Sequence, residues 1–165
     1  MGEVTYEHVD LMLRLYELRR EARLRQARDW FGTNFRATTV EDVRKLCPPG
    51  SEANASLRMV VSYWDMVAGI VNRGLIDKEF FFENSGELWM VWEFVRPIVP
   101  AWRAAFKDPQ VFGNLEQAAK DMEAWREERA PGSIEAMRQM MAQMDQAAKA
   151  AKDEQEPPKA KTAGN

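Results

Sequence analysis

The chain has 165 residues, of which 45% are hydrophobic and 30% charged, and its 23 Lys and Arg residues against 26 Asp and Glu residues give a formal net charge of −3. This composition excludes a chain that is disordered throughout, and the weak negative charge provides no general attraction for nucleic acid or an anionic membrane. One Cys and one His exclude an internal disulfide and the usual zinc sites, so we expect no metal or cofactor. No apolar run is long enough to span a bilayer, and the start lacks the features of a signal peptide, so we expect a cytoplasmic protein.

Hydrophobic residues recur with a period near 3.6 almost everywhere, which predicts an all-helical protein. A first helix is expected over about residues 5–30, and it is apolar around more than half of its circumference, so it should pack on two sides. Thr39 and Asp42 have the spacing of a capping box and predict a short helix that ends near Leu46, before two prolines.

A third helix is expected over about residues 51–73. Gly74 follows at the position where a left-handed residue ends a helix. Asp77 is expected to cap the next short helix, in which Phe81 has the spacing to form a hydrophobic staple with Ile76.

A Trp-rich helix is expected over about residues 86–106, and it contains Pro97 and Pro100. Each proline removes a backbone donor, so the pattern predicts a kink or two helices that meet at an angle. A further helix is expected over 115–128, capped by Asn114 and Gln117.

A break at Ala130–Gly132 separates that helix from a last one, which Ser133 is expected to cap and which ends near Lys152. The predicted fold is therefore an all-α bundle of five to seven helices with a kinked Trp-rich helix and a C-terminal appendage helix. The predicted organisation is a helical domain over 1–129, a Met-rich amphipathic helix over 130–152, and a polar, disordered tail over 153–165.

The middle of the chain resembles a bacterial helical family that is known only as a domain of unknown function. The resemblance covers roughly Val4 to Trp125. It is carried by an arginine-headed helix that begins Ser56-Leu57-Arg58, by the turn Arg73-Gly74-Leu75-Ile76-Asp77, and by a Trp-rich helix that continues into Arg96-Pro97-Ile98 and Trp102-Arg103. It implies a helical fold and a bacterial origin, and it implies no activity.

Four charged residues on the two middle helices are candidate ligand-binding residues, namely Arg58, Asp65, Glu93 and Arg96. Arg58 and Asp65 share a polar stripe with Gly69, and Glu93 and Arg96 share a face beside the prolines. They predict either a small-molecule or anion pocket between the helices over 51–73 and 86–106, or a buried ionic network that fixes helix register. The sequence leaves both interpretations open.

The last helix carries the clearest interaction pattern. Ile134, Met137, Met141 and Met144 follow the 3-4 spacing of a coiled-coil seam, with Met140 beside it. Methionine is flexible and polarizable, so such a face suits adaptable binding. The helix either packs back on its own domain or contacts a protein partner, and the partner can be a second copy of the chain.

Other function classes have weaker support. The arginines of residues 14–28 alternate with acidic residues in i,i+4 pairs such as Asp10–Arg14 and Glu21–Arg25, which argues against nucleic-acid binding. Cys47 lies in a Pro-Pro turn with no downstream His, and His8 is alone, so no catalytic motif is found. The aromatic belt is expected to be core, or else a surface for peripheral membrane association; its members are Trp64, Phe80, Phe81, Phe82, Trp89, Trp92, Phe94 and Trp102.

These observations favour a non-enzymatic helical interaction or scaffold protein that contacts its partner through the Met-rich helix. A small-molecule or anion-binding regulatory domain is the first alternative. A peripheral membrane protein is the second.

Overall fold

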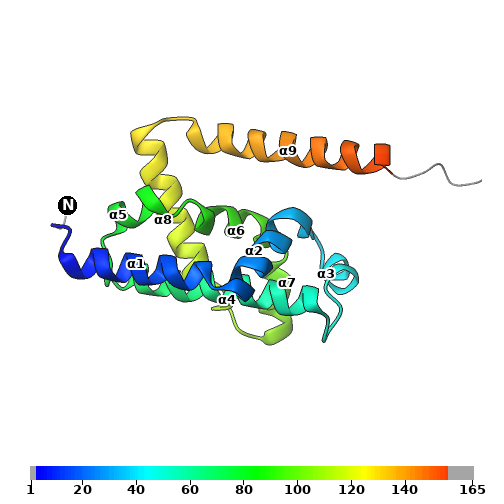
Figure 1. The fold of residues 1–165 in the computed structure, drawn as a ribbon, viewed down its shortest axis with the longest axis horizontal. Coiled ribbons are helices and arrows are strands. Elements are labelled where there is room, and N and C mark those ends of the chain that lie inside the picture. The colour runs from blue at the N-terminus through cyan, green and yellow to red at the C-terminus, as the bar shows by residue number, and fades with distance from the viewer. Residues whose placement is uncertain (1–2, 156–165) are drawn as a thin grey trace, which may run out of the picture. The chain divides into compact units, whose positions relative to one another are not determined.

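A computed structural model describes residues 3–155, with side chains over residues 3–151 (Figure 1). The described part of the chain contains helices and no strands. Its nine helices are α1 (Tyr6–Arg20), α2 (Ala22–Asn34), α3 (Val40–Leu46), α4 (Glu52–Asn72), α5 (Lys78–Asn84), α6 (Glu87–Val95), α7 (Val99–Phe106), α8 (Gly113–Arg129) and α9 (Ser133–Gln155).

The all-helical class is confirmed, but the predicted number of five to seven helices is wrong. The expected first helix divides at Glu21, whose backbone is extended (φ −53°, ψ 139°) and whose carboxylate accepts hydrogen bonds from the N–H groups of Arg23 and Leu24, both at 3.0 Å. A carboxylate in that position satisfies free donors at the start of a new helix. In the sequence, Glu21 also has the i,i+4 spacing of an ion pair with Arg25, and that predicted pair hides the helix start.

The Trp-rich segment also forms two helices, which was one of the two alternatives predicted from its prolines, and not the single kinked helix of the predicted bundle. Pro97 lies in the turn that joins α6 to α7, and Pro100 lies in the first turn of α7, where a missing N–H costs no hydrogen bond. The two prolines therefore place the division between residues 95 and 99.

Two of the predicted helix starts are confirmed. The hydroxyl of Thr39 accepts from the N–H of Asp42 at 3.1 Å, and the Asp42 carboxylate accepts from the N–H of Thr39 at 2.9 Å, which completes the capping box of α3. The Asp77 carboxylate caps α5 by accepting from the N–H of Phe80 at 2.9 Å. These hydrogen bonds span three residues, so local spacing was enough to predict them.

Residues 3–122 form one compact unit, and its core is built around α4. This helix packs mainly against α2, contacts α5 and α6, and is buried on much of its circumference. Trp64 and Trp89 are 2% and 1% exposed, so most of the predicted aromatic belt is core, while Phe80, Phe94 and Trp102 are partly exposed. Burial of such side chains is the main favourable contribution to folding.

Residues 123–155 belong to a second compact unit, which contains the end of α8 and all of α9. Ser133 does not cap α9 as predicted, because its hydroxyl is buried without a hydrogen-bond partner among the described residues. The Glu127 carboxylate performs this role by accepting from the N–H groups of Gly132 at 2.8 Å and Ile134 at 2.9 Å. An ion pair of 2.6 Å between Arg138 and Glu123 also joins α9 to α8.

The boundary between these units lies inside α8. The division at residues 129 and 152 that the sequence suggested stays a prediction. The helix α9 continues to Gln155, three residues beyond the expected end, and residues 156–165 of the predicted disordered tail lie outside the described residues.

Candidate functional site

The strongest charged cluster of the first unit is centred on Glu87, at the first position of α6. Arg28 of α2 binds its carboxylate with two hydrogen bonds, from Nε at 2.6 Å and from Nη2 at 2.5 Å. Trp64 of α4 donates its indole N–H to the same carboxylate at 3.3 Å, and Arg19 of α1 lies 3.7 Å away. Four helices thus meet at one carboxylate, which also benefits from the positive end of the α6 dipole.

The groups around this cluster satisfy each other's polar atoms. Arg28 donates a further hydrogen bond to the backbone carbonyl of Arg19 at 3.2 Å, near the end of α1. The Tyr63 hydroxyl donates to the carbonyl of Leu15 at 2.6 Å, and burial raises the pKa of Tyr63 to about 12. The hydrogen bond to Glu87 raises the pKa of Arg28 above its usual value, so the guanidinium stays charged. These hydrogen bonds and ion pairs link α1, α2, α4 and α6 at one point of the fold.

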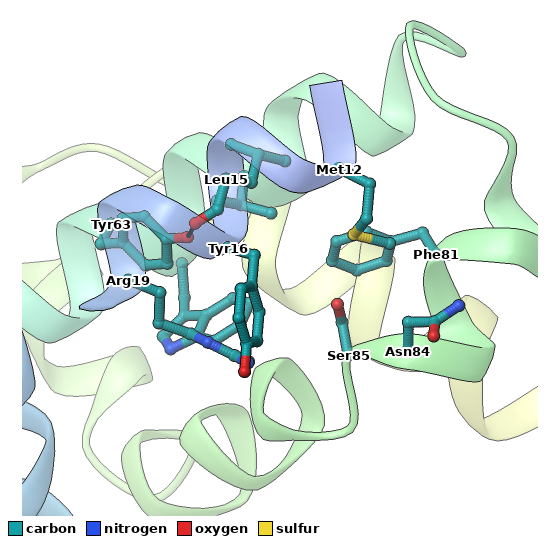
Figure 2. A pocket seen from close by; sticks show the side chains of 10 residues that line it. Met12, Leu15, Tyr16, Arg19, Tyr63, Phe81, Asn84 and Ser85 are labelled. Carbon is teal, nitrogen blue, oxygen red and sulfur yellow. Dashed lines mark hydrogen bonds between the residues drawn. The ribbon is translucent and has the colours of Figure 1, made fainter. Parts of the chain in front are cut away.

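A small cavity lies beside this cluster (Figure 2). Arg19 and Tyr63 lie at one end of it, and Phe81, Asn84 and Ser85 lie at the other. Its volume of about 20 Å³ is close to the minimum that holds one water molecule. It is therefore too small for an organic ligand.

The structure does not bring the four predicted charged residues together. Asp65 belongs to α4, and its side chain reaches the start of α8. There its carboxylate accepts hydrogen bonds from the N–H of Leu115 at 2.9 Å and from the Asn114 side chain at 3.5 Å. Asp65 therefore caps α8 from α4, in place of the predicted caps Asn114 and Gln117. A Cβ at Gly69 would lie 2.9 Å from Arg73 Nη1, whereas its distance of 3.4 Å from Asn114 Nδ2 would be an ordinary van der Waals contact.

Glu93 of α6 forms an ion pair of 3.3 Å with Arg96, the residue that follows this helix, and the Glu93 side chain is only 6% exposed. Arg58 lies apart from them on the exposed side of α4. It makes no hydrogen bond or ion pair with any residue that the structure describes. Of the four predicted residues, two are thus paired, one caps a helix, and one is left without a partner.

An apolar groove of about 430 Å³ lies beside Arg58, within the size range of small-molecule sites. It lies between α3, α4, α7 and the loop after α7, in the region where the sequence predicted a pocket, but only Arg58 of the four predicted residues lines it. The other lining residues are Val43, Asn54, Leu57, Val61, Ser62, Trp102, Phe106 and Phe112.

The aromatic side of the groove is held by a loop in unusual backbone conformations. Lys107 and Phe112 both have left-handed φ angles, of 52° and 54°, which are strained for residues with a Cβ. Arg103 stabilises this loop by donating to the carbonyl of Val111 at 3.0 Å and by pairing with Glu116 at 2.6 Å. The loop therefore holds the Phe112 ring against Trp102, with ring centroids 5.5 Å apart.

The predicted partner-binding residues of α9 differ in exposure. Ile134 is buried, and Met137 and Met141 are partly exposed. Met140 and Met144 are 56% and 64% exposed. The most exposed large apolar side chains of α9 are therefore two of the predicted residues, Met140 and Met144. They lie on a stripe that we call the Met/Ala face and that consists of Ala136, Met140, Met144, Ala147 and Ala151.

The two side chains considered for catalysis, Cys47 and His8, lie in environments that favour a structural role. Burial raises the pKa of the Cys47 thiol, which disfavours the reactive thiolate. The His8 ring accepts from the backbone N–H of Thr5 at 3.3 Å and caps α1.

Over residues 3–151, no group of three or more His, Cys, Asp or Glu side chains is placed to hold a metal ion. None of the described helices combines the length and apolar character needed to cross a membrane.

Glu87 and the aromatic residues Phe106 and Phe112 are not among the site residues predicted from the sequence. No local pattern marks Glu87, because its partner Arg28 is 59 residues away in the chain. Phe106 and Phe112 flank the Asp108-Pro109 turn, a signal that could have directed attention to this loop.

Over the described residues, the fold and its sites define an all-helical protein in which Asp65, Glu87 and Arg103 of the middle helices bind residues of neighbouring helices. The chain belongs to the family described as domain of unknown function (DUF4760), whose model matches residues 5–125. The match includes the Glu87 cluster and the groove, and it ends before α9. Comparisons with the curated proteins and with the solved structures give no match.

Proposed function

We propose that this protein is a non-enzymatic helical interaction protein, and that it associates through the Met/Ala face of α9 with the same face of a second copy of the chain. The observation that carries the proposal is the exposure of Met140 and Met144, at 56% and 64%, on a helix of 23 residues. Large apolar side chains that cluster on one exposed helix face are typical of an interaction surface.

The sequence of the face supports pairing with itself. The methionines lie toward the start of the face, and Ala147 and Ala151 lie toward its end. If two copies of α9 run antiparallel, Met140 of one copy lies opposite Ala151 of the other, and Met144 lies opposite Ala147. Each large side chain then meets a small one, and the arrangement is two-fold symmetric, as an isologous dimer requires.

Sedimentation equilibrium of the full chain tests this proposal. The wild-type chain should show a reversible monomer–dimer equilibrium. The double variant Met140→Glu/Met144→Glu should be monomeric, because pairing would bury four unpaired carboxylates in the dimer. A matched control is Ala142→Glu/Gln146→Glu, which adds the same charge with the same four-residue spacing at two exposed positions on the opposite side of α9. This control should dimerise like the wild type.

A wild-type chain that stays monomeric at high concentration contradicts the proposal. Equal loss of association in both double variants also contradicts it, because the effect would then come from general charge repulsion. Circular dichroism of each variant verifies that α9 remains helical.

A further inference from the structure

We infer that the groove beside Arg58 binds small molecules that carry one carboxylate on an apolar body. This site lies in the first unit, so it is independent of the proposed association through α9. Three features of the groove support it, namely its composition, the state of Arg58, and the rigidity of its aromatic side.

The lining of the groove is apolar at its base and aromatic along one side. Val43, Leu57 and Val61 are nearly fully buried and form the base, at 8%, 3% and 2% exposure. Trp102 and Phe106 line the groove from α7, and Phe106 is 69% exposed. An exposed phenylalanine beside a concave apolar surface leaves apolar area that a ligand can cover.

The other side of the groove is a polar edge with a single charge. Asn54, Arg58 and Ser62 follow one another at four-residue spacing on α4, so they lie along one side of that helix. Arg58 is the only charged residue among those that line the groove. A guanidinium binds a carboxylate with two parallel hydrogen bonds, and one cation matches one negative charge better than a doubly charged phosphate.

Arg58 differs from the nearby Arg103 in whether its guanidinium already has a hydrogen-bond partner. Arg103, on α7, donates hydrogen bonds to the Val111 carbonyl and to the Glu116 carboxylate. Arg58 has no partner among the described residues, so a ligand carboxylate would not have to displace an existing ion pair. The strained and braced loop after α7 keeps the aromatic side in place before any ligand arrives, which lowers the entropy cost of binding.

Isothermal titration calorimetry with decanoate and with the neutral analogue 1-decanol tests the inference. Wild-type protein should bind decanoate about tenfold more tightly than decanol, because only decanoate forms charge-assisted hydrogen bonds with Arg58. Arg58→Gln should remove this preference and leave decanol binding unchanged. Phe106→Ser should weaken the binding of both probes, because it removes apolar area that both ligands contact.

Arg44→Gln is the matched control. Arg44 lies on α3, next to the lining residue Val43, but it does not line the groove itself. This variant removes the same charge from the same region and should bind decanoate like the wild type. The α9 variant Met140→Glu/Met144→Glu should also bind decanoate normally, which separates this site from the proposed association.

Several results would overturn the inference. One is the absence of decanoate binding at millimolar concentration. Others are equal affinity for the two probes, or an equal loss in Arg44→Gln and Arg58→Gln, since either would show that Arg58 does not recognise the carboxylate. Binding of phosphatidylcholine vesicles in place of dissolved decanoate would assign the aromatic surface to a membrane and also overturn it.

Discussion

Arg28 and Arg58 belong to the same unit, but they lie in opposite environments. Arg28 is about one-fifth exposed, and a bidentate ion pair joins it to Glu87. Arg58 is exposed, lies beside an apolar groove, and pairs with no described residue. A largely buried charge needs an oppositely charged or hydrogen-bonding partner within the fold, whereas water can stabilise an exposed charge without such a partner. The comparison indicates that Arg28 stabilises the fold and that Arg58 is available to bind.

The largest expected effect is the loss of Glu87. Glu87→Ala should lower the free energy of unfolding by about 3 kcal/mol, because it leaves Arg28 and the Trp64 indole N–H without their partner in a largely buried site. Urea denaturation followed by tryptophan fluorescence measures this change. Asp10→Ala breaks the exposed pair with Arg14 and should cost less than about 0.5 kcal/mol. Similar losses in the two variants would contradict a structural role for the Glu87 cluster.

Asp65 tests whether a predicted ligand-binding residue is structural. Asp65→Ala should destabilise the first unit by about 1–2 kcal/mol, because the N–H of Leu115 loses its acceptor and the start of α8 loses a favourable charge. Asp65→Asn keeps an acceptor and should recover part of the loss in the same urea experiment. Glu17→Ala, an exposed acidic residue on α1, is the control. A fully stable Asp65→Ala would return Asp65 to the ligand-binding candidates.

Glu127 extends the comparison to a partly exposed charge that accepts hydrogen bonds from the backbone. Hydrogen bonds from the N–H groups of Gly132 and Ile134 lower the pKa of Glu127 below its usual 4.5. The folded pKa is thus below the unfolded one, so this carboxylate stabilises the turn above pH 4.5, and the stabilisation is lost as the pH falls through the folded pKa.

Nuclear magnetic resonance can follow the amide signals of Gly132 and Ile134 during an acid titration. Both signals should move with one midpoint, below the usual glutamate value. In Glu127→Gln this step should disappear, while Glu128→Gln, at an exposed neighbour, should leave it unchanged. A step that persists in Glu127→Gln would show that another group titrates there.

Local features of this fold could be predicted from sequence, and distant ones could not. The capping box at Thr39 and the cap at Asp77 depend on residues three positions apart, so spacing revealed them. The division at Glu21 was missed because a glutamate beside arginines also fits an i,i+4 ion pair, and periodicity does not decide between the two. The helix count is wrong for this reason and because two prolines separate α6 from α7.

The candidate sites show the same limit. The polar stripe of α4 correctly placed Arg58 and Asp65 on one side of a helix. The backbone N–H that Asp65 accepts, however, comes from Leu115, 50 residues away, and the aromatic residues of the groove beside Arg58 come from α7 and the loop after it. Whether each charge is matched depends on that tertiary packing. The interpretation of the four charged residues as one network or one pocket therefore could not be decided before the fold was known.

Substitution of Arg58 is expected to show the smallest effect on the free energy of unfolding, and this result would separate the role of Arg58 most clearly from that of Arg28. Arg58→Gln should change the free energy of unfolding by less than about 0.5 kcal/mol, as is usual for an exposed residue without partners. Arg28→Gln, the same substitution at the matched arginine, should cost several times more in the same urea experiment. If Arg58→Gln is as destabilising as Arg28→Gln, then Arg58 supports the fold through its aliphatic part over the groove. If it is neutral, any loss of decanoate binding in this variant reports on the guanidinium itself.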